Sequence, residues 1–327
     1  MRVALIGNFV PEFSTENDLK DAMERLGWTV RAIQSGDHDP LVDLVEDLRY
    51  RGNVPDFIVW VRTASLWDKW GTEIQWKLLA EARRRDVPVV GYHLDRWWGL
   101  KRQDEIRQGL QSQPFFHCDL LVTADGGHDD QWKLEGINHV WFLPAVSERW
   151  CEPGRFQPEL ETDIVFAGSW QGGYHREWGH RPELVAWLQK TYGDRVRFWP
   201  KQGEGAVRGL ALNDVYWSAK VVVGDSCLAP KVNGDPMTNY CSDRVPETLG
   251  RGGLLIHPNV EGVTDVFGHP SWLLGDWDML RFQIDYWIGR SNEVDRMTAI
   301  ERTKKKHTYT VRMRQLEELL IDRVMLP

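Results

Sequence analysis

Arg244 and Glu247 are the two residues whose types and spacing most clearly indicate chemistry. They stand three positions apart in the segment 242–253, SDRVPETLGRGG, and would share one face of a helix. An arginine in a first helical turn lies where backbone N–H groups favour an anion, and its planar fork can hold phosphate oxygens. A carboxylate one turn later can accept both hydroxyl protons of a ribose diol. The pair therefore predicts a site for the diphosphate and ribose of a nucleotide sugar.

The residues around this pair predict one short helix that leads into a buried strand. Ser242 or Asp243 suits the N-cap, and Pro246 is tolerated in the first turn. Gly250 suits the left-handed residue that ends a helix. The apolar run 254–257 then has the character of a buried strand.

This block resembles the donor site of GT-B glycosyltransferases, in particular the CgeB-like group related to spore-coat glycosyltransferases. The pattern of that group is Arg-x-x-Glu, a turn of small residues and a hydrophobic strand. The resemblance covers the whole chain in architecture and is specific only in this block. It implies an α/β protein of GT-B architecture: two Rossmann-like, doubly wound lobes that face a cleft, with a C-terminal helix that returns to the first lobe.

The same resemblance implies an enzyme that moves a hexose-like sugar from a nucleotide diphosphate, such as a UDP-sugar, to a hydroxyl group. It implies no metal and no cofactor beyond this co-substrate. Many retaining GT-B enzymes carry two glutamates eight positions apart, whereas the residue eight before Glu247 is Asn239. The stereochemical outcome is therefore open. An inverting enzyme would need a base such as Asp95, and a retaining one would rely on it less.

Length and composition favour a protein of two domains. A chain of 327 residues is long for a single core. The formal net charge is −8 and the pI is about 5.7, so no global positive field attracts a polyanion. The four cysteines are far apart, the apolar run 2–6 is too short for a signal peptide, and no stretch reaches the about 20 apolar residues of a membrane span. These features predict a cytoplasmic protein without a membrane span.

Apolar runs that alternate with helical patterns predict parallel sheets covered on both faces. We expect an N-terminal acceptor-side lobe over 1–150, a linker over 151–162, a nucleotide-sugar-binding lobe over 163–285 and a helical tail over 286–327. The predicted strands are 2–6, 28–33, 56–61, 88–93, 119–123 and 140–143 in the first lobe, and 163–168, 196–199, 220–224, 253–257 and 271–274 in the second. The predicted helices include 41–50, 73–85, 104–111, 182–192, 212–219 and a tail that is helical from about residue 280.

Residues that follow the strands of the second lobe are candidates for donor binding, because doubly wound sheets bind ligands at the carboxyl ends of their strands. Ser169 follows a glycine after the first strand, where backbone N–H groups can approach a phosphate. Lys201 follows the second strand and adds a point charge. Either feature also occurs as an ordinary turn or surface residue.

Corresponding positions in the first lobe supply candidates for the acceptor side and for the base. Asn8 and Glu16 follow the first strand and can hydrogen-bond a sugar or an acceptor, although Glu16 also suits a helix cap. Asp95 is the predicted general base and His93 its competitor, at the end of the fourth strand. Trp97 offers a stacking face to a sugar ring or a base.

Other functions are open to the same residues. A metal-dependent GT-A transferase binds its donor through Asp-x-Asp, which occurs at 37–39 and 276–278. A non-catalytic nucleotide-sugar-binding protein would keep the donor residues without a working base. A dinucleotide oxidoreductase ranks low, since no Gly-x-Gly-x-x-Gly follows the first strand.

The acceptor is not identified by the sequence. Basic residues at 96–102 are interleaved with tryptophans, so a hydroxymethylated DNA base is one admissible acceptor. A glycan, a protein hydroxyl and a small metabolite are equally admissible. The sequence does not indicate an oligomeric state.

Overall fold

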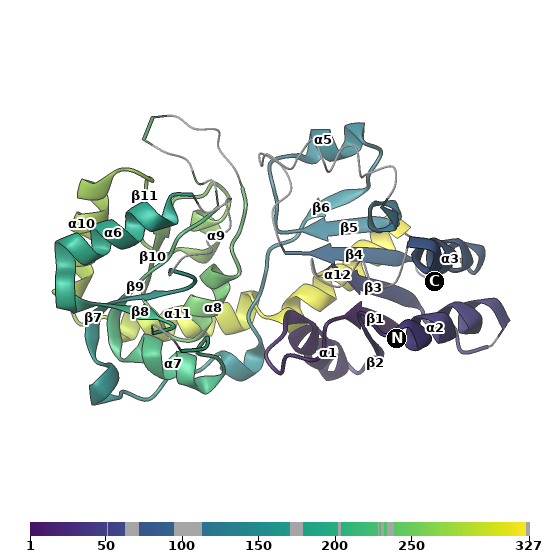
Figure 1. Ribbon diagram of the computed structural model, residues 1–327, viewed down its shortest axis with the longest axis horizontal. Helices are drawn as coiled ribbons and strands as arrows, with labels where there is room; N and C mark the ends of the chain where they lie inside the picture. The colour runs from purple at the N-terminus through teal and green to yellow at the C-terminus, as the bar shows by residue number, and fades with distance from the viewer. Residues whose placement is uncertain are drawn as a thin grey trace. The chain divides into compact units, whose positions relative to one another are not determined.

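The structure is a computed structural model that describes residues 1–50, 52–62, 72–94, 113–170, 179–201, 204–227, 229, 232–233 and 239–324. The chain divides into two compact units (Figure 1). The first contains Met1–Leu143 and Tyr309–Pro327, and the second contains Pro144–Thr308. No helix in the described ranges is both long enough and apolar enough to cross a bilayer.

A parallel sheet with strand order β2-β1-β3-β4-β5-β6 forms the centre of the first unit. Its strands are β1 (Arg2–Gly7), β2 (Thr29–Gln34), β3 (Phe57–Val61), β4 (Val89–His93), β5 (Leu120–Thr123) and β6 (His139–Trp141). Its α-helices are α1 (Thr15–Arg25), α2 (His38–Tyr50), α3 (Thr72–Arg84), α5 (Asp129–Leu134) and α12 (Tyr309–Val324). Every residue of β3, β4 and β5 is buried, as expected for parallel strands covered on both faces.

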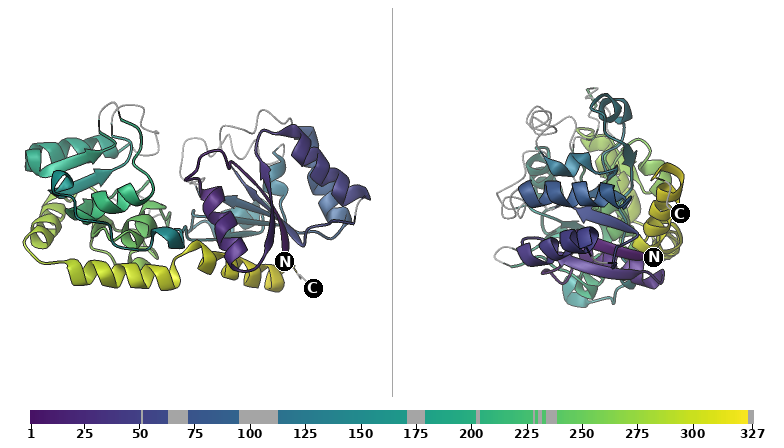
Figure 2. Two further views of the ribbon diagram at one scale, coloured as in Figure 1. Left: turned by 90° about the horizontal axis from the view of Figure 1, so that it is seen from below. Right: turned by 90° about the vertical axis from the view of Figure 1, so that its right-hand side faces the viewer.

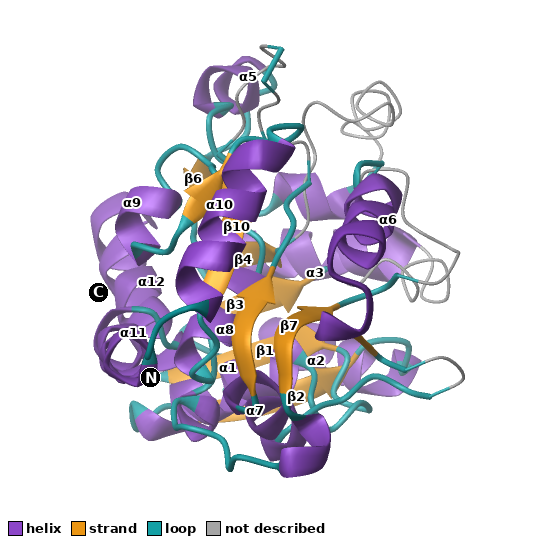
Figure 3. Cartoon of the chain, turned by 90° about the vertical axis from the view of Figure 1, so that its left-hand side faces the viewer, coloured by secondary structure: helices purple, strands orange, loops and turns teal. Residues whose placement is uncertain are grey.

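The second unit has a parallel sheet with strand order β11-β10-β9-β7-β8, flanked by helices (Figure 3). Its strands are β7 (Thr162–Ala167), β8 (Val196–Trp199), β9 (Ala219–Val223), β10 (Leu255–Pro258) and β11 (Ser271–Trp272). Its α-helices are α6 (Arg181–Tyr192), α7 (Leu210–Trp217), α8 (Arg244–Gly250), α9 (Thr264–Phe267), α10 (Trp277–Ile288) and α11 (Glu293–Lys306). Two α/β units with parallel sheets are therefore confirmed.

Each sheet has a crossover point at which the chain reverses its direction of travel across the sheet. In the first unit it lies between β1 and β3, because the chain goes from β1 to β2 on one side and then returns to β3 on the other. In the second it lies between β7 and β9. Loops at the carboxyl ends of two such strands leave in opposite directions, which opens a crevice for ligands. These two points are where the structure positions candidate sites.

The last helix returns to the first unit, as predicted. α12 packs against α1, and Arg312 Nε donates a hydrogen bond to the carbonyl of Leu143 at 2.8 Å (Figure 2). The tail before it is broken into separate helices. α10 begins at Trp277 and not near residue 280, because Asp276 caps it by accepting the N–H of Met279 at 2.9 Å.

Gly250 is the last residue of α8, but it is not the left-handed residue, so that part of the prediction was wrong. α8 continues through Gly250, and the left-handed residue is Gly252, with φ of 78°. A glycine is needed at position 250 because the packing leaves no room for a side chain. A Cβ there would lie 2.8 Å from Val146 Cγ1 and 3.2 Å from Cys151 Sγ. The predicted helix 104–111 lies outside the described residues, and the short helices α5 and α9 were not predicted.

Residues 151–162, the predicted linker, lie within the second unit and are docked on α7. Asn213 Nδ2 donates to the carbonyls of Trp150 and Glu152 at 3.0 and 2.9 Å. The N–H of Arg155 donates to Asp214 Oδ1 at 2.7 Å. The segment therefore enters the second unit in a fixed path and helps to hold α7.

Gly154→Ala is expected to destabilise the second unit by about 1–3 kcal/mol, because overpacking against backbone cannot be relieved by a rotamer change. A Cβ on Gly154 would lie 2.6 Å from the backbone nitrogen of Asp214, and the Asn213 carbonyl is closer still. Urea unfolding measures the loss. Gly205→Ala is the matched control, since a Cβ there meets nothing within 4 Å. Equal stability of the two variants would contradict the docking of this segment.

Candidate functional site

Arg244 lies at the crossover point of the second sheet. It is the first residue of α8, and its Nη1 donates to Asp225 Oδ1 at 2.6 Å. Its guanidinium also lies against the end of β7, because a Cβ on Gly168 would come within 2.7 Å of Arg244 Nη2. The side chain is 25% exposed. Arg244 therefore connects the ends of β7 and β9, and its side chain remains partly exposed.

Asp225 is the buried anchor of this arginine. It follows β9 by two residues and is 0% exposed. A second arginine, Arg181 at the start of α6, binds the same carboxylate through Nε to Oδ2 and through Nη2 to Oδ1 at 3.2 Å. Burial alone raises the pKa of Asp225, but Arg244 and Arg181 outweigh it and lower the pKa below its ordinary value. The carboxyl group is therefore ionised in the folded protein.

Burial also opposes the charge of Arg244, since desolvation lowers a guanidinium pKa. The attraction of Asp225 outweighs this effect, and the pKa of Arg244 is raised. Each ionised group thus depends on the other. Sequence reasoning assigned no role to Arg181 or to Asp225. The available signals were an arginine before Pro182 at a helix start and an aspartate at a strand end.

Glu247 lies one turn after Arg244 on α8 but does not pair with it. Its Oε2 accepts a hydrogen bond from Arg251 Nε at 2.6 Å, and its side chain is 24% exposed. Arg251 is buried and also donates to the carbonyl of Gly209 at 2.9 Å and to Asn213 Oδ1 at 2.7 Å. The buried arginine fixes the position of a carboxylate that still reaches the surface.

Ser169 and Lys201 follow neighbouring strands at the same end of the sheet. Ser169 is exposed after β7, and its carbonyl accepts a hydrogen bond from Arg181 Nη1 at 3.2 Å. Lys201 is exposed after β8, with its Nζ 4.9 Å from the ring centroid of Trp199. The structure therefore brings Ser169 together with Arg181, Asp225 and Arg244, and places Lys201 at the adjacent edge strand.

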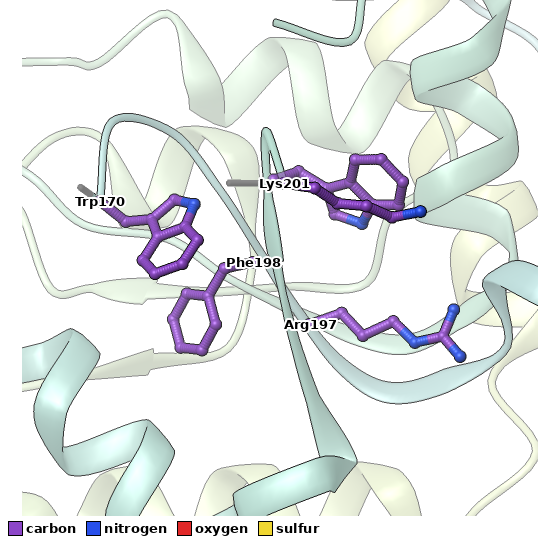
Figure 4. A pocket seen from close by; sticks show the side chains of 5 residues that line it. Trp170, Arg197, Phe198 and Lys201 are labelled. Carbon is purple, nitrogen blue, oxygen red and sulfur yellow. The ribbon is translucent and has the colours of Figure 1, made fainter. Parts of the chain in front are cut away.

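A hollow of about 240 Å³ lies at this edge strand (Figure 4). The rings of Trp170 and Phe198 are 5.0 Å apart, and Figure 4 shows Arg197 directed away from them. The lining residues are Trp170, Arg197, Phe198, Trp199 and Lys201. Aromatic faces beside cationic side chains are suited to a planar or ring-shaped ligand.

Asn8 and Glu16 meet at the crossover point of the first sheet. The N–H of Asn8 donates to Glu16 Oε1 at 3.2 Å, and Gln34 Nε2 donates to Asn8 Oδ1 at 3.1 Å. Glu16 is 4% exposed, and burial raises its pKa above the ordinary 4.5. The helix cap of α1 is Ser14, whose side chain accepts the N–H of Asn17 at 3.2 Å. Glu16 therefore holds the loop after β1.

Of the two predicted bases, the structure describes His93. His93 is the last residue of β4, is buried, and has its ring 6.4 Å from that of Phe115. Asp95 and Trp97 lie outside the described residues. Within the described ranges, no group of three or more His, Cys, Asp or Glu side chains is placed to hold a metal ion.

Solved structures with similar folds cover almost the whole chain. Anabaena HepE in complex with UDP and glucose is 10% identical, with a TM-score of 0.57 over 98% of this chain and 100% of HepE. A glycosyltransferase from Rickettsia africae ESF-5 is 10% identical, with a TM-score of 0.58 over 99% of this chain and 98% of its own. These full-length matches confirm the predicted GT-B architecture.

The fold by itself does not define the reaction. A putative UDP-N-acetylglucosamine 2-epimerase from Listeria monocytogenes is 9% identical, with a TM-score of 0.51 over 98% of this chain and 96% of its own. No curated protein matches the sequence. The model of one family, described as "Glycosyl transferase-like", matches residues 149–318, which is more than half of the chain and includes Ser169, Asp225, Arg244 and Glu247. The chain therefore belongs to the glycosyl transferase-like family.

Proposed function

We propose that the protein transfers a sugar from a nucleotide-diphosphate donor bound by the second unit to a hydroxyl group of an acceptor bound by the first. The observation that carries the proposal is Arg244, which is held by buried Asp225 at the crossover point of a sheet in the family's domain. A partly exposed guanidinium at this point suits a diphosphate. UDP is the favoured nucleotide, because the similar HepE structure is a complex with UDP and glucose.

The proposed roles follow from the charge that develops during transfer. The acceptor hydroxyl attacks the anomeric carbon, the bond from that carbon to the donor phosphate breaks, and negative charge grows on the departing diphosphate. Arg244, Lys201 and the backbone at Ser169 would stabilise this charge, while Glu247 would accept the ribose hydroxyls. Because guanidinium and ammonium groups can meet the diphosphate charge, we propose that no metal is required.

The proton of the acceptor hydroxyl passes to a base of the protein if the enzyme inverts, and to the departing donor phosphate if it retains. Asp95 and His93 remain the proposed bases, with Asn8, Glu16 and Trp97 on the acceptor side. The acceptor remains open, with a hydroxymethylated DNA base among the candidates. Assignment to the CgeB-like group and a cytoplasmic location are further proposals, which rest on the motif at 242–253 and on the widely spaced cysteines.

The metal-dependent alternative is less favoured by the structure. Asp276, in the second Asp-x-Asp, caps α10. Its carboxylate therefore has a structural role that does not require a nucleotide-sugar donor or a metal. A non-catalytic nucleotide-sugar-binding protein would bind the same donor as the proposed enzyme. It would differ only in showing no transfer or hydrolysis of the sugar.

A panel of UDP-, GDP-, ADP- and dTDP-sugars tests the function. One donor is expected to raise the melting temperature and to be slowly hydrolysed, with both effects retained in excess EDTA. Loss of turnover with EDTA would favour the metal-dependent alternative. Binding without turnover would favour the non-catalytic one, and no binding to any donor would refute the proposal.

Glu247→Gln is expected to weaken UDP binding by about tenfold, because a charge-assisted hydrogen bond to the ribose is lost. Calorimetric titration with UDP and with 2′-deoxy-UDP shows whether the loss of affinity arises at the ribose 2′-hydroxyl. Removing the 2′-hydroxyl should weaken binding to the wild type and have little further effect in the variant. Glu261→Gln, at an exposed glutamate of the same unit, is the control. Equal UDP affinity in folded Glu247→Gln would contradict the ribose role.

Glu16→Gln tests the buried carboxyl through pH. Because its pKa is raised, the folded state binds the Glu16 proton more tightly than the unfolded state. This contributes stability at acid pH that is lost as the pH rises through the folded pKa. The variant cannot ionise at this position. The melting temperature of the variant minus that of the wild type should therefore increase as the pH rises above about pH 4. Exposed Glu12→Gln is the control. A pH-independent difference for Glu16→Gln would show that burial does not penalise the charge.

A further inference from the structure

Two arginines share one buried carboxylate beneath the proposed donor site. Asp225 Oδ1 accepts hydrogen bonds from Arg244 Nη1 at 2.6 Å and Arg181 Nη2 at 3.2 Å, while Oδ2 accepts from Arg181 Nε. The three side chains come from the ends of different elements: the start of α6, the loop after β9 and the start of α8. The formal charges of these three side chains sum to one positive charge. The carboxylate of Asp243 also attracts the Arg244 guanidinium, but Asp243 is exposed, so water screens its charge more strongly than that of buried Asp225.

The two arginines differ in what they can reach. Arg181 is 3% exposed, whereas the side chain of Arg244 is 25% exposed. Arg181 directs its described hydrogen bonds to Asp225 and to the carbonyl of Ser169. A ligand at the ends of the strands would therefore contact Arg244 and not Arg181.

This difference matters because Asp225 and Arg244 alone would form a neutral pair. A neutral pair attracts a diphosphate weakly, since the field of the guanidinium is cancelled by the carboxylate beside it. Arg181 adds a second positive charge behind the carboxylate, where interactions are less screened than in water. It also holds the carbonyl of Ser169, and so orients the peptide group between Ser169 and Trp170.

We propose that Arg181 is a positioning residue for donor binding: it offsets the charge of Asp225, so that Arg244 is held in place and still presents a net positive charge to the donor diphosphate. This inference rests on the proposed function. It assigns a role in donor affinity to a side chain that does not itself touch the donor.

The test is a double-mutant cycle of Arg181→Met and Asp225→Asn, with UDP and uridine titrated by calorimetry. Arg181→Met makes the remaining pair neutral and should weaken UDP binding by about tenfold while leaving uridine binding nearly unchanged. The double variant restores one net positive charge and should bind UDP more tightly than Arg181→Met alone. A purely structural role predicts instead that the double variant binds no better than Arg181→Met.

Two further variants serve as controls. Arg195→Met removes the same charge, but from a pair with Asp163 at the start of β7, the opposite end of the strand, and should leave UDP binding unchanged. Arg181→Lys keeps the charge but loses the two-pronged contact with Asp225, so it should bind UDP more weakly than the wild type and more tightly than Arg181→Met. It keeps the test decisive if Arg181→Met does not fold, because UDP binding by Arg181→Lys with no dependence on the Asp225→Asn change would also overturn the inference.

The outcomes separate this inference from the proposed function. If the wild type binds UDP but Arg181→Met weakens uridine and UDP equally, or the double variant shows no recovery, the inference is overturned and the function stands. If UDP, GDP, ADP and dTDP all fail to bind the wild type, the proposed function is refuted, and the inference with it.

Discussion

The ionised Asp225 carboxylate is the constraint on which the site depends. A buried carboxylate costs several kcal/mol in desolvation unless charged partners and hydrogen bonds compensate it. Here the partners are the first residues of two helices that follow β7 and β9, so satisfying the carboxylate brings both helix starts to the crossover point. Removing either arginine would leave a buried charge that is only partly compensated. The same interaction that stabilises this end of the sheet therefore also fixes the position of the guanidinium that we propose binds the donor.

A second buried network extends this arrangement along α8. Arg251 holds Glu247 and also Asn213 on α7, and Asn213 in turn binds the carbonyls of Trp150 and Glu152. The proposed ribose carboxylate is thus linked to the segment by which the chain enters the second unit. Since these groups share hydrogen bonds, their contributions to stability and to binding are not additive. Arg-x-x-Glu is in this sense a structural pattern as well as the proposed donor-binding one.

Local patterns in the sequence predicted what depends on neighbours in the chain. The strands follow from apolar runs, and Arg244 and Glu247 follow from their helical spacing. The partnership of Arg181 and Asp225 was not predictable in this way, because 44 positions separate them and only the folded sheet brings them together. Gly250 and Gly252 could not be told apart for a related reason. Either glycine can adopt the left-handed conformation, and only the structure shows that Gly252 adopts it and that Gly250 lies where a Cβ would meet Val146 and Cys151.

The net charge of the protein and the charge of its proposed donor have the same sign. A chain with a formal charge of −8 would repel an anionic nucleotide sugar if the total charge decided binding. At physiological ionic strength, however, exposed charges separated by more than about 8 Å are largely screened, whereas partly buried ones are screened much less. Binding is then governed by the few charges at the ends of the strands. The side chains of Arg181, Arg244 and Asp225 carry one net positive charge there, and in the proposed role of Arg181 this charge would allow an acidic protein to bind an acidic substrate.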